Sequence, residues 1–493
     1  MSRARLLLVG NGMTGDRLLE ELERRGGLER YDVTVVGDEI HGAYSRILLS
    51  EVLAGAEAET IVSKPASWYD ERGVTLISGR MVDRLDRDRR VAVLEGGDEV
   101  PYDVAVLALG ANAIILPIPG IDPASGVLPG GVHVFRTLAD CLVLRAEVDP
   151  SRGRRSAAVV GGGLLGLELA KTLADQGHRV SLVHPFETLM NTQLDRIGGD
   201  ILRTHVEAAG IEVVVGMTSG LRGDPVEAIE LEDGRVIDVE TVVLAVGARP
   251  RVDLARRSGL EVDKGILIDD WLRTSDGNVY AIGDCAQHEG AGFGLVAPGW
   301  DQALVLADLL TGDRAARYRG STTYARLKAA GVEVASLGML EPERDDDDVV
   351  QVIQERRGVY RKLVIRDGRL AGAIAVGDPD AGALLVGMLD RGLPLPENPV
   401  DIFCSPAAHA GAGPALEVEV CTCNHVAEPE ILAAIDDGCS TVADLKRVTK
   451  AGTGCGSCTG ALARLIHDHA PASDAAGAGW PRPPDLVGAA PAG

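Results

Sequence analysis

Residues 159–170 read VVGGGLLGLELA, and this stretch decides the fold. A strand-like run, Ala157–Val160, precedes three glycines in G-x-G-x-x-G spacing, and a helical run, Leu164–Gln176, follows. The glycines are Gly161, Gly163 and Gly166. In such a turn the first glycine allows the tight bend, the second lets a pyrophosphate approach the backbone, and the third lets the helix pack on the strand. With the next strand, Arg179–Val183, the stretch predicts a βαβ unit that binds a dinucleotide.

The same pattern occurs about 150 residues earlier in the chain. GNGMTG (10–15) follows the strand-like run Leu6–Val9 and opens a helical run, Thr14–Arg25. Its glycines are Gly10, Gly12 and Gly15. Asp38 follows the next strand, Asp32–Val36, where a carboxylate can accept hydrogen bonds from ribose hydroxyls. Two such units predict an α/β fold with two Rossmann-like domains and two nucleotide sites. No Gly/Ser-rich or Pro-rich linker divides the first four hundred residues, so we expect these domains to be interleaved.

The chain has 493 residues, a hydrophobic content of 46% and a formal net charge of -24. This length predicts three or four domains. A strongly acidic chain repels phosphate backbones and anionic lipids, so we expect neither nucleic acid nor membrane as a partner. The sequence shows no secretory signal and no run of ~20 apolar residues, which predicts a cytoplasmic protein.

Beyond about residue 320 the pattern changes to short strands typical of an antiparallel sheet. The strand-like runs are Val332–Leu337, Val349–Gln354, Lys362–Arg366 and Ala371–Val376. We interpret the acidic run Asp345–Asp348 as a solvated loop between two of these strands. A small cysteine-bearing unit follows, with helical runs at Thr441–Thr449 and Cys458–His467, and the Ala/Pro/Gly-rich end, 471–493, is predicted to be disordered.

Four of the eight cysteines form the pattern C-x-C-x31-C-x2-C. They are Cys421, Cys423, Cys455 and Cys458. Four thiolates on two short loops are suited to a [2Fe–2S] cluster. Zinc is the main alternative, although C-x-C is shorter than the usual zinc spacing, and unligated cysteines are a third. We expect the other four cysteines to be packed small residues: Cys141, Cys285, Cys404 and Cys439.

Four motifs together resemble those of the two-dinucleotide-fold flavoproteins: GNGMTG, LALGA (107–111), AVGARP (245–250) and YAIGDCA (280–286). The resemblance implies FAD at the first glycine turn and NAD(P)H at the second. By position it implies further cofactor-binding residues, which are Arg46, Val82, Ala108, Glu168, Gly247 and Asp284.

Each of these positions has an implied role. Arg46 resembles the residue that contacts the FAD pyrophosphate, and the backbones of Val82 and Ala108 resemble contacts to the adenine side. Asp284 is placed to bond the ribityl chain, and Glu168 resembles the carboxylate beside the nicotinamide. The alternatives are an ordinary ion pair for Arg46, strand packing for Val82 and Ala108, and a helix-surface position for Glu168.

The stretch LVAPGWDQALVLADLL (295–310) resembles the helix whose N-terminus points at the flavin ring. That position would bring Trp300 and Asp301 near the ring, with core packing as the alternative for Trp300. Residues 41–50, HGAYSRILLS, contain no cysteine, which excludes a dithiol relay beside the flavin at this position.

The choice between NADH and NADPH should depend on the residues after the strand Arg179–Val183. His184 and Pro185 stand there, rather than the acid typical of NAD sites or the arginine typical of NADP sites. We favour NADH because no cluster of arginines follows. A protonated His184 is the alternative, since it would help to bind a 2′-phosphate.

The segment around the patterned cysteines closely resembles the bacterioferritin-associated-ferredoxin-like [2Fe–2S] domain. Over about residues 5–470 the domain order resembles the N-terminal half of the NAD(P)H nitrite reductase large subunit and the electron-transfer subunit of bacterial assimilatory nitrate reductase. The implied parts are an FAD-binding domain (1–120 and 246–318), an NAD(P)-binding domain (121–245), a small α+β domain (319–412), the helical [2Fe–2S] domain (416–470) and the tail.

These resemblances imply an NAD(P)H-dependent FAD oxidoreductase that passes electrons through a [2Fe–2S] cluster to a separate nitrate or nitrite reductase catalytic subunit. The sirohaem-binding half of nitrite reductases is not found after Cys458, so we expect nitrite or nitrate reduction to belong to that subunit. No side-chain nucleophile or general base is required, and none is assigned. Two alternatives remain: a reductase of another acceptor (a ferredoxin, a monooxygenase or a quinone), or a non-catalytic redox-sensing or iron-release partner.

Overall fold

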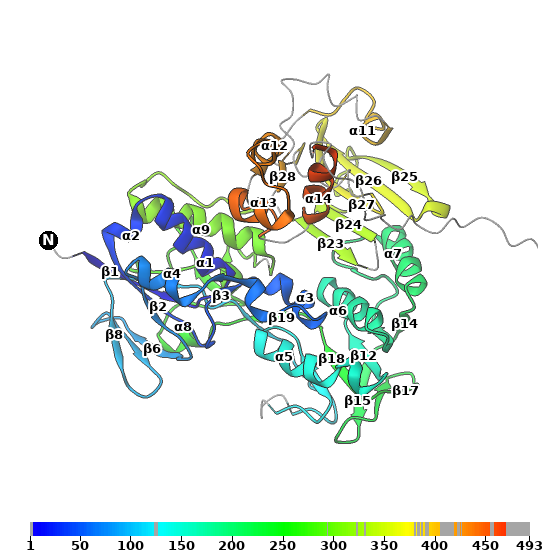
Figure 1. Ribbon diagram of the computed structural model, residues 1–493, viewed down its shortest axis with the longest axis horizontal. Coiled ribbons are helices and arrows are strands. Elements are labelled where there is room, and N and C mark those ends of the chain that lie inside the picture. Colours follow the sequence, from blue (N-terminus) through cyan, green and yellow to red (C-terminus); the bar gives the residue numbers. More distant parts are fainter. Residues whose placement is uncertain are drawn as a thin grey trace, which may run out of the picture.

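The computed structural model contains two parallel sheets, an antiparallel sheet and a small helical unit (Figure 1). The described residues are 3–122, 127–292, 294–321, 324–329, 332–378, 394–404, 419–421, 426–453 and 458–469, with the single positions 381, 385, 388, 389 and 424. The predicted α/β fold class is confirmed.

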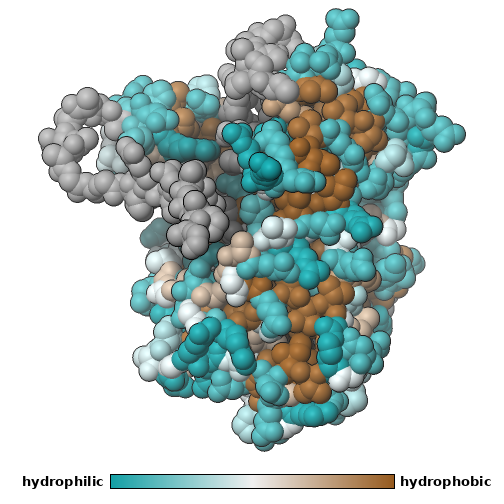
Figure 2. Space-filling model, turned by 90° about the vertical axis from the view of Figure 1, so that its right-hand side faces the viewer, coloured by the Kyte–Doolittle hydropathy of each residue, from teal (hydrophilic) through white to brown (hydrophobic). Residues whose placement is uncertain are grey.

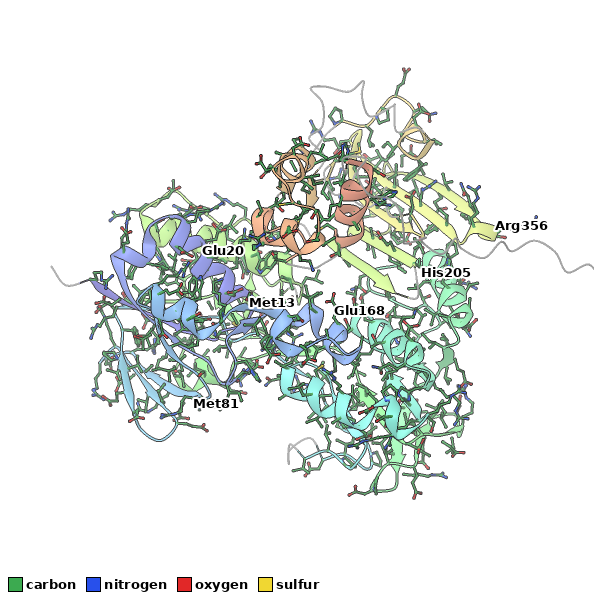
Figure 3. The ribbon with its side chains drawn as sticks, viewed as in Figure 1. Met13, Glu20, Met81, Glu168, His205 and Arg356 are labelled. Atoms are coloured by element: carbon green, nitrogen blue, oxygen red, sulfur yellow. The ribbon has the colours of Figure 1, made fainter. Side chains whose placement is uncertain are left out.

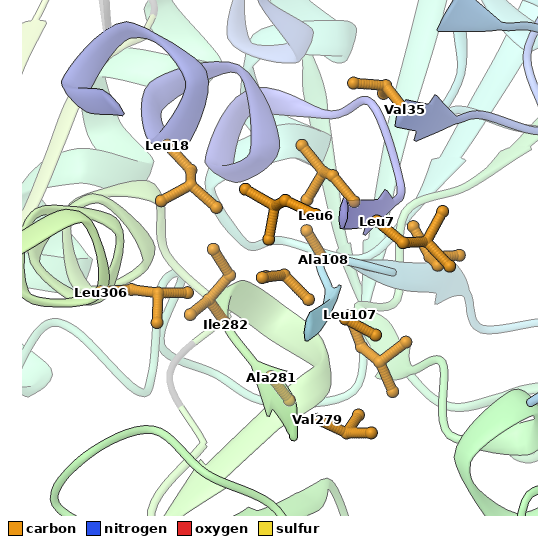
Figure 4. Packing of buried hydrophobic residues seen from close by; sticks show 14 of the residues in the cluster. Leu6, Leu7, Leu18, Val35, Leu107, Ala108, Val279, Ala281, Ile282 and Leu306 are labelled. Carbon is orange, nitrogen blue, oxygen red and sulfur yellow. The ribbon is translucent and has the colours of Figure 1, made fainter. Parts of the chain in front are cut away.

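The first sheet has five parallel strands in the order β21-β9-β1-β2-β5. They are β1 (Ala4–Val9), β2 (Tyr31–Val36), β5 (Thr75–Ile77), β9 (Val104–Leu107) and β21 (Val279–Ala281). Helices α1 (Met13–Arg24) and α9 (Val296–Thr311) lie side by side against it (Figure 1). Leu18 and Leu306 of these helices are fully buried in the same core as Leu6 and Leu107 of the strands (Figure 4).

The second sheet is also parallel, in the order β11-β18-β12-β13-β14. Its strands are β11 (Val132–Val134), β12 (Ser156–Val160), β13 (Arg179–His184), β14 (Glu212–Val215) and β18 (Thr241–Leu244). Its helices are α5 (Leu138–Glu147), α6 (Leu164–Asp175) and α7 (Arg196–Ala208). Every strand and helix predicted for the two parallel sheets is present, with bounds that differ by at most two residues.

The second sheet is an insertion into the first. The chain leaves the first sheet along β10 (Ala111–Ala113) and returns along β19 (Ala248–Pro250), and these two strands pair antiparallel. Only afterwards does β21 join β9 in the first sheet. The two parallel sheets are therefore interleaved in sequence, as the absence of a linker led us to expect.

Two antiparallel three-stranded sheets, absent from the prediction, branch from the parallel ones. Their strands are β6 (Val82–Asp86), β7 (Val91–Leu94), β8 (Glu99–Pro101), β15 (Thr218–Arg222), β16 (Ala228–Leu231) and β17 (Val236–Asp238). The remaining short elements are α2 (Gly27–Arg30), β3 (Ala43–Tyr44), α3 (Leu49–Leu53), β4 (Val62–Lys64), α4 (Ala66–Glu71), α8 (Asp253–Arg257), β20 (Ile266–Ile268), β22 (Ala286–His288) and α11 (Asp401–Cys404).

The third sheet is antiparallel, as the sequence predicted, and its strand order is β23-β24-β27-β26-β25; strand β23 was not among the four predicted strands. Its strands are β23 (Tyr324–Ala329), β24 (Val332–Gly338), β25 (Asp348–Gln354), β26 (Val359–Arg366) and β27 (Arg369–Val376). Figure 2 shows apolar residues gathered on the side of the molecule that carries this sheet. Ile353 of the edge strand β25 is 44% exposed.

The interpretation of Asp345–Asp348 as a purely solvated loop is wrong for one member. Arg366 of β26 donates to both carboxylate oxygens of Asp347 at 2.7 Å, and the Asp347 side chain is fully enclosed. The hydrogen bonds from Arg366 hold the pKa of Asp347 well below its usual range. The acidic run is therefore tied to the third sheet at this residue.

In the cysteine unit (residues 419–469), the described residues form three short helices and a strand pair. The elements are β28 (Glu419–Cys421), β29 (Val426–Ala427), α12 (Glu428–Asp436), α13 (Val442–Thr449) and α14 (Thr459–His469). Ile431, Leu445 and Leu462, one from each helix, are fully buried in its core. Helices α13 and α14 were predicted, whereas α12 was not, although Pro429 in its first turn is a common start signal.

A buried ionic network joins the second sheet to the third. Lys362 of β26 is 2% exposed and contacts Asp195 at 3.0 Å and Glu341 at 2.8 Å. The hydroxyl of Tyr360 donates to the same Asp195 carboxylate at 2.6 Å, and Asp195 also caps α7 by accepting from Gly198 N. Asp195 thus holds two side chains of the third sheet and the start of a helix that packs on the second.

In the described part of the chain, no helix combines the length and the apolar character that crossing a bilayer requires.

Replacement of Asp195 should destabilise this junction strongly. Asp195→Ala leaves Lys362 buried beside Glu341 alone, so we expect a loss of about 3–5 kcal/mol in the free energy of unfolding, measured by urea denaturation. Glu341→Gln is the matched control, because the Glu341 side chain is 63% exposed and should contribute no more than about 1 kcal/mol. If both variants lost an equally small free energy of unfolding, Asp195 would not be the main partner of Lys362 at this junction.

Candidate functional site

A cavity of about 770 Å³ opens at the carboxyl ends of the first sheet. Gly10, Gly37, Ala108 and Ile282, which follow β1, β2, β9 and β21, all line it. Glu168 of α6 and Ala325 of β23 also line it, so the second and third sheets contribute to its wall. Figure 3 shows Met13 and Glu168 at the centre of the molecule, where these parts meet.

The two glycine turns have nearly the same geometry. Gly10 has φ +107°, and a Cβ there would lie 2.2 Å from the carbonyl oxygen of Ala108; Gly161 has φ +120°, and its Cβ would lie 2.3 Å from that of Ala245. Side chains at Gly15 and Gly166 would likewise collide with the carbonyls of Gly10 and Gly161, at 2.6 and 1.8 Å. Only glycine therefore lets each helix start this close to its sheet.

The middle glycines differ from the others. Gly12 and Gly163 are both helix N-caps with φ -87° and ψ -174°, a conformation open to any residue. A Cβ at either position would meet no atom within 4 Å. The protein's own packing does not require glycine here, whereas a pyrophosphate held against the backbone would. The turns therefore fit a dinucleotide phosphate on an observation independent of their motif.

The ribose and phosphate candidates of the first turn are in ion pairs at the cavity. Asp38 bonds Arg251 at 2.7 Å, and Arg46 bonds Glu39 at 2.5 Å. All four residues line the cavity. The alternative of an ion pair for Arg46 is thus what the structure contains, at a place where a phosphate can also reach the guanidinium. Sequence reasoning missed Arg251, although it directly follows AVGARP.

Asp284 lines the cavity and forms an ion pair across the two interleaved parts. Arg136, which precedes α5 of the second sheet, donates to Asp284 at 2.7 Å and to the carbonyl of Ala111 at 3.2 Å. Arg136 itself lines the cavity. No motif marks Arg136, because its role comes only from folding the second sheet against the first.

Val82 and Ala108 line the cavity and are also buried in the first core, which fits the packing alternative, while their contacts to FAD stay a prediction. Val296 at the N-terminus of α9 lines it as well. Trp300 and Asp301 do not line it. Trp300 instead belongs to the core of the cysteine unit and donates from its indole N–H to the carbonyl of Met13 at 3.3 Å, which favours the packing alternative.

Glu168 lies on α6, and its carboxylate accepts no hydrogen bond from the described residues. Burial raises the pKa of this carboxyl to about 7. A group with that pKa is partly protonated near neutral pH, which is unusual for a surface glutamate. The arrangement therefore disfavours the reading of Glu168 as an ordinary helix-surface residue.

His184 and Gly247 lie near the second turn but do not line the cavity. Gly162 N donates to Nδ1 of the buried His184 at 3.0 Å, and burial lowers the pKa of its ring. A ring nitrogen that accepts a backbone N–H is unprotonated, so this contact favours a neutral His184. Gly247 has φ +105° directly before β19. Direct contacts of these residues, and of Gly161, Gly163 and Gly166, with a nucleotide stay predictions.

Cys421 and Cys458 lie in one buried core, 1% and 2% exposed, although 36 residues of sequence separate them. Cys421 ends β28 and Cys458 immediately precedes α14. Cys423 and Cys455 lie outside the described residues, and among the described residues no set of three or more potential metal ligands converges. The two described thiols thus come from the two loops that the spacing predicted.

The other cysteines behave as predicted where they are described. Cys141 and Cys285 are fully buried, and burial raises the pKa of each thiol to about 11, so both stay protonated. Cys439 is half-buried. The side chain of Cys404 lies outside the described residues.

Comparison with known families gives three matches. Residues 4–303 match pyridine nucleotide-disulphide oxidoreductases, 324–392 match the rubredoxin NAD+ reductase C-terminal domain, and 419–468 match the BFD-like [2Fe-2S] binding domain. These matches agree with the predicted cofactors FAD, NAD(P)H and a [2Fe–2S] cluster.

Curated relatives extend over nearly the whole chain. Nitrite reductase [NAD(P)H] of Bacillus subtilis is 35% identical over 96% of this chain and 58% of its own length. The assimilatory nitrate reductase electron transfer subunit of the same organism is 34% identical over 93% of this chain and 59% of its own. The chain therefore spans little more than half of these relatives. Rhodocoxin reductase of Rhodococcus erythropolis is 32% identical over 62% of this chain and 72% of its own.

Solved structures share the fold. The covalent putidaredoxin reductase–putidaredoxin complex matches with a TM-score of 0.74 at 22% identity, covering 84% of this chain and 99% of that chain. The ferredoxin reductase for the CYP199A2 system of Rhodopseudomonas palustris matches with a TM-score of 0.68 at 27% identity, covering 76% of this chain and 91% of its own.

The two middle glycines allow a matched test of the two turns. Gly12→Ala should fold with an unfolding free energy within about 1 kcal/mol of wild type, because its Cβ meets nothing, yet should be purified with far less FAD. Gly163→Ala should keep its FAD and raise the KM for NADH. Cofactor content and steady-state kinetics distinguish the variants, and loss of FAD from both would contradict the assignment of separate sites.

The raised pKa of Glu168 predicts a pH-dependent stability. A carboxyl whose pKa rises from 4.5 to about 7 takes up a proton on folding, so its contribution is full at low pH and is lost as the pH rises through 7. Between pH 5 and pH 9, the free energy of unfolding of wild type should fall by up to about 3 kcal/mol relative to that of Glu168→Gln. Parallel pH profiles of the urea midpoint for the two proteins would show that Glu168 titrates normally.

Proposed function

The chain belongs to the pyridine nucleotide-disulphide oxidoreductase family and carries a BFD-like [2Fe–2S] domain, and from this premise we propose that it supplies electrons from NADH to a separate nitrate or nitrite reductase catalytic subunit. The relatives named for those reactions support the acceptor, since both match over more than nine-tenths of this chain.

One observation carries the proposal that the cysteine unit takes electrons from the cavity. Met13 and Val296 line the cavity and also pack against the core that contains Cys421 and Cys458. A single layer of side chains thus separates the cavity from the unit that carries the patterned cysteines. A docked unit of this kind can serve as the internal acceptor, because the donor and acceptor sites share a wall.

The chain's own residues would hold the cofactors. A bound flavin would accept a hydride from the nicotinamide, and a cluster would pass single electrons onward. Gly12 leaves room for the FAD pyrophosphate, Asp38 offers oxygens to the ribose, and Asp284, fixed by Arg136, offers a carboxylate to the ribityl chain. Cys423 and Cys455 would complete the ligand set begun by Cys421 and Cys458.

Glu168 and His184 would act on the nicotinamide nucleotide. We assign Glu168 to the nicotinamide side because it lines the cavity from α6, the helix that follows the second glycine turn. A neutral His184 attracts a 2′-phosphate less than an imidazolium, which favours NADH. The proposed division of the chain remains 1–120 with 246–318 for FAD, 121–245 for NAD(P)H, 319–412 and 416–470.

A second acceptor class has specific support. Two of the similar proteins are named as reductases of rhodocoxin and of a ferredoxin, so we consider a small electron carrier as the acceptor. Such a carrier would replace the catalytic subunit as the final acceptor without changing the route through the cavity. Nitrate-dependent NADH oxidation on addition of a nitrate reductase catalytic subunit, but not of a ferredoxin, would support the first acceptor.

Anaerobic titration of the holoprotein tests the relay. NADH should bleach both the flavin and the cluster absorption. Cys421→Ser and Cys458→Ser should lose iron, keep FAD and flavin bleaching, and lose most of the reduction of one-electron acceptors. Cys439→Ser, in the same unit, should behave as wild type. Iron-loaded wild-type protein that neither NADH nor NADPH bleaches would refute the proposal.

A further inference from the structure

Asn424 connects three parts of the molecule through one side chain. It directly follows the CTC motif, and its Nδ2 donates to the carbonyl of Lys450 at 2.7 Å and to Oγ1 of Thr453 at 3.1 Å. Lys450 and Thr453 lead into the CGSC motif. Its Oδ1 accepts from Nη1 of Arg17 on α1 at 3.2 Å. The amide orientation follows from its partners, because arginine only donates and a backbone carbonyl only accepts.

Arg17 is held in place from its own side. Its guanidinium contacts Glu21 at 3.0 Å and Glu20 at 3.4 Å, and it lies over the Trp300 ring at 5.5 Å. Glu21 is 2% exposed and is shared with Arg24 and Arg25. Arg17 is therefore a fixed donor rather than a mobile surface arginine.

Both helices beside the cavity present residues four positions apart, which share one helix face. On α1, Met13 lines the cavity and Arg17 meets the cysteine unit; on α9, Val296 lines the cavity and Trp300 enters the core of that unit. The indole of Trp300 donates to the carbonyl of Met13. The position of the cysteine unit is thus fixed by Arg17 and Trp300, which lie one helical turn after the residues that line the cavity.

We propose that Asn424 is a positioning residue that sets both cysteine loops in register with each other and, through Arg17, with the cavity. The inference rests on the proposed function in one respect: the position of the cysteine unit relative to the cavity affects electron transfer only if electrons pass between them. The bonds to Lys450 and Thr453 order the two loops within the unit, and the bond to Arg17 orders the unit on α1. Trp300 and Met13 provide the apolar contact between the cysteine unit and the cavity wall, while the side-chain amide of Asn424 fixes the orientation of the unit on α1.

Two substitutions separate these roles. Arg17→Met keeps an apolar stem on Trp300 and removes the donor, whereas Glu21 retains Arg24 and Arg25. Asn424→Asp keeps the acceptor for Arg17 and places a carboxylate against the Lys450 carbonyl. Arg24→Met is the matched control, because Arg24 also bonds Glu21, is 64% exposed and forms no hydrogen bond or ion pair with the described residues of the cysteine unit.

The iron-loaded holoprotein is measured in three ways: iron per FAD with the EPR spectrum of the dithionite-reduced cluster, stopped-flow bleaching by NADH, and amide hydrogen exchange. For Arg17→Met we expect unchanged iron, EPR spectrum and flavin bleaching. Electron transfer from flavin to cluster should slow by about tenfold or more, as for loss of a hydrogen bond to a charged group. Exchange should rise in residues 426–453. For Asn424→Asp we expect less iron or an altered EPR spectrum.

The outcomes are separable. Wild-type transfer rates and unchanged exchange in Arg17→Met, or equal effects in Arg24→Met, would overturn the docking role. An unaltered EPR spectrum and full iron in Asn424→Asp would overturn the loop role. If wild type itself shows no NADH-driven cluster reduction, the proposed function fails, and the exchange and EPR results still decide the role of Asn424.

Discussion

The close contact between backbone and backbone at the two glycine turns is the constraint on which the rest of the molecule depends. Gly10 lies against the Ala108 carbonyl and Gly161 against the Ala245 carbonyl, at distances that no side chain tolerates. Each contact brings the N-terminus of a helix, with its unpaired N–H groups, to the carboxyl edge of a sheet. The cavity exists because α1 starts there. Since α1 is rigid, its next turn carries Arg17 to a fixed place, and the cysteine unit docks on it.

Much of this could be predicted because it depends on residues close in sequence. Strands and helices of the two parallel sheets follow from local patterns, and the glycine turns from their spacing. The spacing of the cysteines predicted that Cys421 and Cys458 lie close together, and both lie in one core. This was predictable because each motif lies on its own short stretch of chain. Arg136 with Asp284 and Lys362 with Asp195 were not predictable, since each pair joins residues more than a hundred positions apart with no spacing rule.

The structure shows where individual carboxylates lie, which the net charge of the chain does not. A net charge of -24 predicted repulsion from polyanions, but it did not show that Glu21, Asp195 and Asp347 are enclosed and paired with cations. The hydrogen bonds from Arg366 lower the pKa of Asp347, whereas burial raises the pKa of Glu168, which has no cationic partner among the described residues. Among the described acids that line the cavity, Asp38, Glu39 and Asp284 are paired with arginines, whereas Glu168 is not.

The β10–β19 pair gives the two parallel sheets a particular mechanical relation. A single-chain linker allows rotation about many bonds, whereas two hydrogen-bonded strands bend out of their plane and resist twisting and shear. Here Ala111–Ala113 and Ala248–Pro250 form such a ribbon where the described chain passes from the first sheet to the second and back. Helix α3 of the first part also packs against α5 and α6 of the second, so the ribbon and this helix together hold the two nucleotide-binding halves beside each other.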